Sequence, residues 1–130
     1  MPADERVLEL TRLWWLRAAE DLEVARNSRR FRFAACFHCQ QAVEKAMKSL
    51  LVYHQADFEK THDVGQLLSL LRTTSTPPPE SVTETLGELT RFAVETRYPP
   101  GDATDAEVTD ALQKAERFLL WARKQLPKEV

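Results

Sequence analysis

Apolar residues recur every three or four positions through most of this chain, and no segment shows the strict alternation of a β-strand. Near the N-terminus the recurring residues are Val7, Leu10, Trp14, Ala18, Leu22 and Ala25. Such spacing gathers apolar side chains on one face of an α-helix. The chain has only three glycines, and it is rich in the alanine, leucine, glutamate, lysine and arginine that favour helices. The sequence therefore predicts an all-α fold.

Turn-forming sequences divide this pattern into helices. NSRRFR, TTSTPPPE and RYPPGD interrupt it, and three successive prolines cannot continue a helix. We expect the second helix over roughly 31–55, and a third after Thr61 or Asp63, either of which can cap free amides. The fourth helix has the stripe Val82, Leu86, Leu89 and Ala93. Thr104-x-x-Glu107 is a capping box that opens the last helix. An antiparallel up-and-down bundle of four to five helices, forming one domain over residues 1–130, is the expected architecture.

The second helix holds a Cys-x-x-Cys pair that resembles a metal or redox motif. At about 100° per residue, the cysteines share one narrow stripe with apolar residues, and that stripe comprises Cys36, Cys39, Val43, Ala46 and Leu50. His38 projects away from both thiols, and no second cysteine pair completes the four ligands of a zinc site. We therefore interpret the cysteines as small buried hydrophobic residues, and expect neither a metal site nor a cofactor.

The opposite arc of the same helix is polar. It carries Phe37, His38, Gln41, Glu44, Lys45 and Lys48. One interpretation is a solvated face, on which a Glu44–Lys48 pair contributes a few tenths of a kcal/mol. The other is a ligand-facing cleft, which the aromatic ring next to the histidine favours. Both remain open from the residues alone.

Two further features each allow two interpretations. Arg26, Arg29, Arg30 and Arg32 crowd into one short segment, which is either a phosphate contact or a solvated loop. Trp14 and Trp15 are adjacent and cannot both face one core, so one of them should lie at a bundle edge or a subunit contact.

Charge and hydropathy exclude several classes of protein. The composition is 43% hydrophobic and 29% charged with a net charge of -2, which is typical of a soluble globular domain. A general nucleic-acid coat protein would need a basic excess. No apolar run approaches the roughly 20 residues that span a bilayer, and MPADERVLEL lacks the features of a secretory signal. We expect a cytoplasmic protein that does not insert into membranes.

Several segments in this order resemble the HEPN-domain family (higher eukaryotes and prokaryotes nucleotide-binding). They are WWLRAAEDLEVAR, ACFHCQQAVEKAMKSLL, THDVGQLL and TRYP. The resemblance implies a helical bundle that often forms a homodimer. It also implies pairing with a minimal nucleotidyltransferase, frequently as toxin and antitoxin, and a role in nucleotide or RNA transactions.

The resemblance also implies where a ligand would bind. Carried onto this sequence, the nucleotide-facing residues are His38, Gln41, Glu44, Lys45, Lys48, His62, Arg97 and Tyr98. The implied ligand is a nucleotide similar to ATP or GTP, or RNA.

Ribonuclease members of the family carry an Arg-x4-6-His motif in a late helix. No histidine follows His62 here, so Arg91 and Arg97 have no downstream partner. Arg32 and His38 match the spacing, but they lie in the wrong helix for the family pattern. We therefore expect a binding protein rather than an enzyme. A metal-independent ribonuclease toxin that uses Arg32 and His38, and a structural dimeric bundle without catalysis, are the alternatives.

Overall fold

The computed structural model describes residues 2–94 and 103–130, and these ranges form helices joined by short connections, with no strand among them. The elements are α1 (Pro2–Asn27), α2 (Arg32–Tyr53), α3 (Val64–Leu71), α4 (Glu80–Thr83), the 3-10 helix η1 (Leu86–Leu89), α5 (Thr90–Val94) and α6 (Asp105–Gln125). The predicted all-α bundle is confirmed. No helix in the described ranges is long and apolar enough to cross a bilayer.

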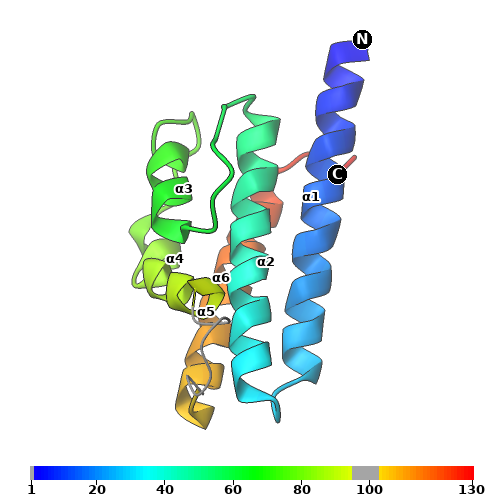
Figure 1. Ribbon diagram of the computed structural model, residues 1–130. Helices are drawn as coiled ribbons and strands as arrows, with labels where there is room; N and C mark the ends of the chain where they lie inside the picture. The colour runs from blue at the N-terminus through cyan, green and yellow to red at the C-terminus, as the bar shows by residue number, and fades with distance from the viewer. Residues whose placement is uncertain (1, 95–102) are drawn as a thin grey trace.

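Helix α2 is the centre of the bundle. Figure 1 shows α1 antiparallel to α2, the shorter helices α3, α4 and α5 on the other side of α2, and α6 passing behind it. The predicted inner stripe of α2 is fully or almost fully buried, and it comprises Cys36, Cys39, Val43, Ala46 and Leu50. Burial raises the pKa of the Cys39 thiol to about 12, and the neighbouring Cys36 adds to this effect. The interpretation of both cysteines as core residues is therefore confirmed.

Local capping chemistry sets the starts of two helices. The Asp63 carboxylate accepts a hydrogen bond from the backbone amide of Gln66 at 3.2 Å, so Asp63 is the N-cap of α3. The predicted capping box is present at α6, where Thr104 Oγ1 accepts from the Glu107 amide at 3.1 Å and Glu107 Oε1 accepts from the Thr104 amide at 3.0 Å. These contacts satisfy backbone donors that the first helical turn leaves free.

The predicted continuous fourth helix is wrong. Its residues form α4, η1 and α5 in succession, because Thr85 takes a left-handed conformation with φ 57° and interrupts the helical hydrogen bonds. Leu86 and Leu89 are nevertheless buried. Separate turns can therefore bury the same apolar stripe that a single helix would.

The predicted apolar stripe of α1 is correct only in its C-terminal half. Ala18, Leu22 and Ala25 are buried, whereas Leu10 is 45% exposed. Thr11 takes the inward position, and its backbone oxygen accepts a hydrogen bond from Ser49 Oγ at 2.8 Å. Thr11 lies seven residues before Ala18, which is two helical turns, so it stays on the buried face while Leu10 turns outward.

Candidate functional site

A pocket of about 400 Å³ lies between α1, α2 and the connection formed by residues 54–63. Its lining residues are Trp14, Gln41, Glu44, Lys45, Lys48, Phe58, Lys60 and His62. Five of them, Gln41, Glu44, Lys45, Lys48 and His62, are residues that the sequence suggested as ligand-facing. The structure therefore brings together five of the six predicted positions that lie within the described residues.

Glu44 organises the inner wall of this pocket. Its Oε2 atom accepts a hydrogen bond from Lys48 Nζ at 3.0 Å, and its Oε1 atom lies 2.9 Å from His62 Nδ1. The interpretation of Glu44 and Lys48 as a solvated pair is wrong, because their side chains are only 3% and 7% exposed. His62 of the 54–63 connection contacts Glu44, and Trp14 of α1 lies beside Lys48. A buried carboxylate needs such partners to remain charged.

Gln40 holds the connection against α2. This fully buried side chain donates from Nε2 to Glu44 Oε1 and to the backbone oxygen of His62, each at 3.1 Å. Gln41 donates in turn to Gln40 Oε1 at 2.7 Å. Sequence reasoning missed Gln40, although it lies four residues after Cys36 on the inner stripe, and a polar residue there is a detectable signal. Gln40 thus positions Glu44 and His62 together.

Asp21 of α1 joins His38 and Lys45 of α2. Its two carboxylate oxygens lie 2.8 Å from His38 Nδ1 and 2.6 Å from Lys45 Nζ. His38 therefore faces Asp21 and is absent from the lining of the pocket, while Lys45 lies at the border with a second hollow of about 130 Å³ beside Arg17 and Glu20. The sequence does not reveal this contact, because Asp21 lies on α1 and the spacing of residues along α2 says nothing about which α1 residues pack against it.

Two aromatic side chains complete the pocket. Trp14 comes from α1 and Phe58 from the connection, and both are half-buried. Lys48 Nζ lies 5.3 Å from the centroid of the Trp14 ring, within the range of a cation–π contact. Trp15 instead packs against the core. The two tryptophans thus face different surroundings, as their adjacency requires.

The charges lining the pocket are mainly positive. The lining includes three lysines, Lys45, Lys48 and Lys60, and one carboxylate, that of Glu44. His62 adds a group that becomes cationic when protonated. Ammonium groups are donors without acceptors, and each carries three hydrogens. The arrangement can hold an anionic ligand that also has a flat, apolar part.

The same bundle occurs in proteins of known structure. The family model of the HEPN domain matches residues 11–125. This chain belongs to the HEPN-domain family. The domain is similar to the crystal structure of ST0689, an archaeal HEPN homologue, with 26% identity, a TM-score of 0.72, and coverage of 88% of this chain and 96% of that one. It is also similar to the crystal structure of TT1696 from Thermus thermophilus, with 26% identity, a TM-score of 0.73, and coverage of 89% and 98%. No curated protein matches the chain.

Three of the four arginines around the α1–α2 turn of this HEPN domain bind to α6, while Arg30 lies over the Phe31 ring. Arg26 Nε lies 3.3 Å from Glu116 Oε1, Arg29 donates to Thr109 Oγ1 at 2.9 Å, and Arg32 Nε donates to Asp105 Oδ1 at 2.7 Å.

The two residues suggested as a ribonuclease pair, Arg32 and His38, thus contact different helices, α6 and α1. This geometry does not bring them to one site within a single chain. Arg97 and Tyr98, which were also suggested as ligand-facing, lie outside the described residues.

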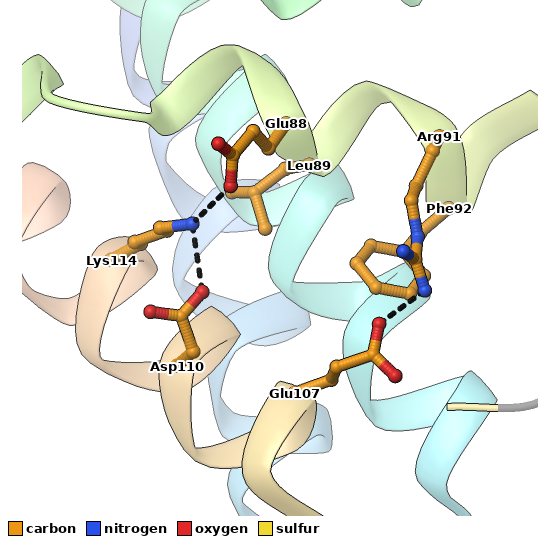
Figure 2. A pocket seen from close by; sticks show the side chains of 7 residues that line it. All are labelled: Glu88, Leu89, Arg91, Phe92, Glu107, Asp110 and Lys114. Atoms are coloured by element: carbon orange, nitrogen blue, oxygen red, sulfur yellow. Dashed lines mark hydrogen bonds and ion pairs between the residues drawn. The ribbon is translucent and has the colours of Figure 1, made fainter. Parts of the chain in front are cut away.

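A further hollow lies between η1, α5 and α6 (Figure 2). It measures about 120 Å³ and is lined by Glu88, Leu89, Arg91, Phe92, Glu107, Asp110 and Lys114. Arg91 is paired with Glu107, and Lys114 Nζ lies 3.2 Å from Glu88 and 2.7 Å from Asp110. The cations here are neutralised by neighbouring carboxylates, so this hollow is held by ion pairs and offers no unpaired cation to an anionic ligand.

No group of three histidine, cysteine, aspartate or glutamate side chains with the geometry of a metal site occurs in the described parts of the HEPN domain. Asp21–His38 and Glu44–His62 each bring together only two such groups.

Proposed function

We propose that this HEPN domain is a cytoplasmic nucleotide-binding or RNA-binding protein that acts with a minimal nucleotidyltransferase, as one half of a toxin–antitoxin pair. The observation that carries the proposal is the pocket between α1, α2 and the 54–63 connection, where three lysines and a histidine meet two aromatic rings. The ligand is a nucleotide similar to ATP or GTP, or a nucleotide within RNA.

The two parts of a nucleotide match the two kinds of residue in this pocket. Phosphate groups attract ammonium and imidazolium groups, which donate charge-assisted hydrogen bonds. A base stacks on an aromatic side chain, and this stacking depends little on which base it is. The volume of about 400 Å³ lies in the range of small-molecule pockets, roughly 300–1,000 Å³. A mononucleotide is therefore a suitable occupant.

Existing ion pairs do not prevent Lys45 and Lys48 from contacting such a ligand. Lys45 donates to Asp21 and Lys48 to Glu44, and each ammonium retains further hydrogens. The pairs also keep both lysines in fixed positions, which lowers the entropy lost when the ligand binds.

Isothermal titration with ATP and GTP tests this proposal. Lys60→Glu reverses one charge in the pocket and should weaken binding by about tenfold or more. Lys124→Glu, at an exposed position of α6, is the matched control and should bind as the wild type does. An absence of heat at millimolar concentrations of both nucleotides would show that the proposal is wrong.

The partnership and a homodimer are further parts of the proposal. Leu13, Leu16 and Val24 are exposed along α1, and exposed apolar patches of this kind often mark protein contacts. Light scattering after gel filtration, with and without a purified minimal nucleotidyltransferase, measures both assemblies. A monomer that does not comigrate with the nucleotidyltransferase would contradict them.

A further inference from the structure

Two polar groups lining the pocket have no partner within the described residues. One is the ammonium group of the exposed Lys60. The other is Nε2 of His62, since only Nδ1 of this ring is bonded, at 2.9 Å from Glu44 Oε1. The His62 side chain is 70% exposed. Both groups can therefore contact a ligand without breaking an existing interaction.

The other two cations of the pocket are already neutralised. Lys45 Nζ lies 2.6 Å from Asp21, and Lys48 Nζ lies 3.0 Å from Glu44 while facing the Trp14 ring. A negative group on the ligand is attracted most strongly to a cation that is not already paired with a carboxylate. Within this pocket, that place is beside Lys60 and His62.

We propose that Lys60 and His62 Nε2 form a phosphate subsite, and that binding of the phosphate is accompanied by proton uptake from solvent at His62. The inference rests on the proposed function, and it adds which residues hold the phosphate and how pH controls affinity. The Glu44 carboxylate keeps a hydrogen on Nδ1. Nε2 must therefore acquire its own hydrogen to donate to a phosphate oxygen, which makes the ring an imidazolium.

Charged groups near His62 include some that favour the protonated ring and some that oppose it. Those that line the pocket with it are Glu44, Lys45 and Lys48 from α2 and Lys60 from the connection, while Glu59 and Asp63 are close to it in the chain and α1 contributes the uncharged Trp14. The carboxylates favour the imidazolium and the lysines oppose it. A bound phosphate adds negative charge directly at Nε2 and shifts this balance toward the protonated ring. When the ligand leaves, the proton returns to solvent.

Calorimetric titration with AMP and with adenosine tests the subsite, because the two probes differ only in the phosphate. Titrations at about pH 7 in PIPES and in imidazole, which differ in protonation enthalpy, report how many protons accompany binding. His62→Asn places an amide donor near the Nδ1 position, and so can keep the bond to Glu44 while removing Nε2. We expect this variant to take up fewer protons with AMP and to bind AMP about tenfold more weakly. Its affinity for adenosine should stay unchanged.

Two controls separate the subsite from general effects. His54 lies at the end of α2 with Nε2 2.9 Å from Thr76, outside the pocket, so His54→Asn should keep the proton uptake of the wild type. Lys60→Gln should weaken the binding of AMP but not that of adenosine, and Lys124→Gln should change the affinity for neither probe.

Each outcome decides the inference. Unchanged proton uptake and AMP affinity in His62→Asn would overturn it while leaving the proposed function intact. Equal weakening of AMP and adenosine would also overturn it, because that pattern indicates a disturbed pocket. If His62→Asn does not fold, Lys60→Gln decides: weaker binding of AMP with unchanged binding of adenosine supports the subsite, and an unchanged ratio of the two affinities overturns it. A failure of the wild type to bind either probe overturns the inference, while the titrations with ATP and GTP decide the proposed function separately.

Discussion

The ammonium group of Lys48 lies 3.0 Å from the Glu44 carboxylate, and both side chains are almost completely buried beneath the 54–63 connection. They lie four positions apart on one helix, and a pair at this spacing on an exposed surface contributes only a few tenths of a kcal/mol. Burial changes the energetics, because each charge now depends on the other.

Removal of Lys48 should therefore destabilise the domain strongly. Lys48→Met leaves the Glu44 carboxylate buried without its ammonium partner, and we expect the free energy of unfolding to fall by about 3–5 kcal/mol. Urea denaturation followed by circular dichroism measures the change. Lys124→Met, at an exposed position, is the control and should change stability by less than about 0.5 kcal/mol. A similarly small loss in Lys48→Met would contradict a buried pair.

The α6 capping box should make stability depend on acidity. The backbone hydrogen bond from Thr104, and to a smaller degree the Arg91 guanidinium, lowers the pKa of Glu107 below its usual 4.5. A lowered pKa means that the folded state holds the carboxylate proton less tightly than the unfolded state. Its stabilising effect is present above pH 4.5 and is lost as the pH falls through the lowered folded-state value.

Urea denaturation from neutral to acidic pH measures this effect. We expect Glu107→Gln to lose stability near neutral pH and to show a flatter decline in acid than the wild type. Glu23→Gln removes an exposed carboxylate from α1 and should keep the steeper decline. Parallel profiles for wild type and Glu107→Gln would contradict the role of this carboxylate.

The two cysteines should be inert in the folded protein. Burial raises the pKa of Cys39 to about 12, and the reactive form of cysteine is the thiolate. We expect slow labelling of both thiols by Ellman's reagent at mildly alkaline pH, and rapid labelling of both in concentrated urea. Rapid labelling of the native domain would show that this part of the core opens readily.

The separation of Arg32 from His38 predicts that the domain alone does not cleave RNA. Their side chains contact Asp105 and Asp21 on different helices. Gel analysis of tRNA incubated with the wild type and with His38→Ala, with chelator present and pancreatic ribonuclease as a positive control, measures this. Cleavage by the wild type would contradict the prediction, and loss of that cleavage in His38→Ala would favour the ribonuclease alternative.

Much of the fold follows from local sequence. A helix of about 100° per residue turns Cys36 and Cys39 inward together, and the Thr104 capping box depends only on residues within one turn. Helical periodicity does not, however, identify where a stripe is interrupted. Thr85 therefore breaks the expected fourth helix without any change in the apolar pattern.

The candidate site is built from more than one helix, so the pattern of a single helix could predict only part of it. The sequence by itself determined that Gln41, Glu44, Lys45 and Lys48 share a face of α2, because that depends on helical geometry alone. Only the tertiary structure decided what covers this face: Asp21 of α1 against His38 and Lys45, and His62 of the connection against Glu44. Such contacts depend on how helices rotate and pack against each other, which is settled by the burial of the whole core and not by any local spacing.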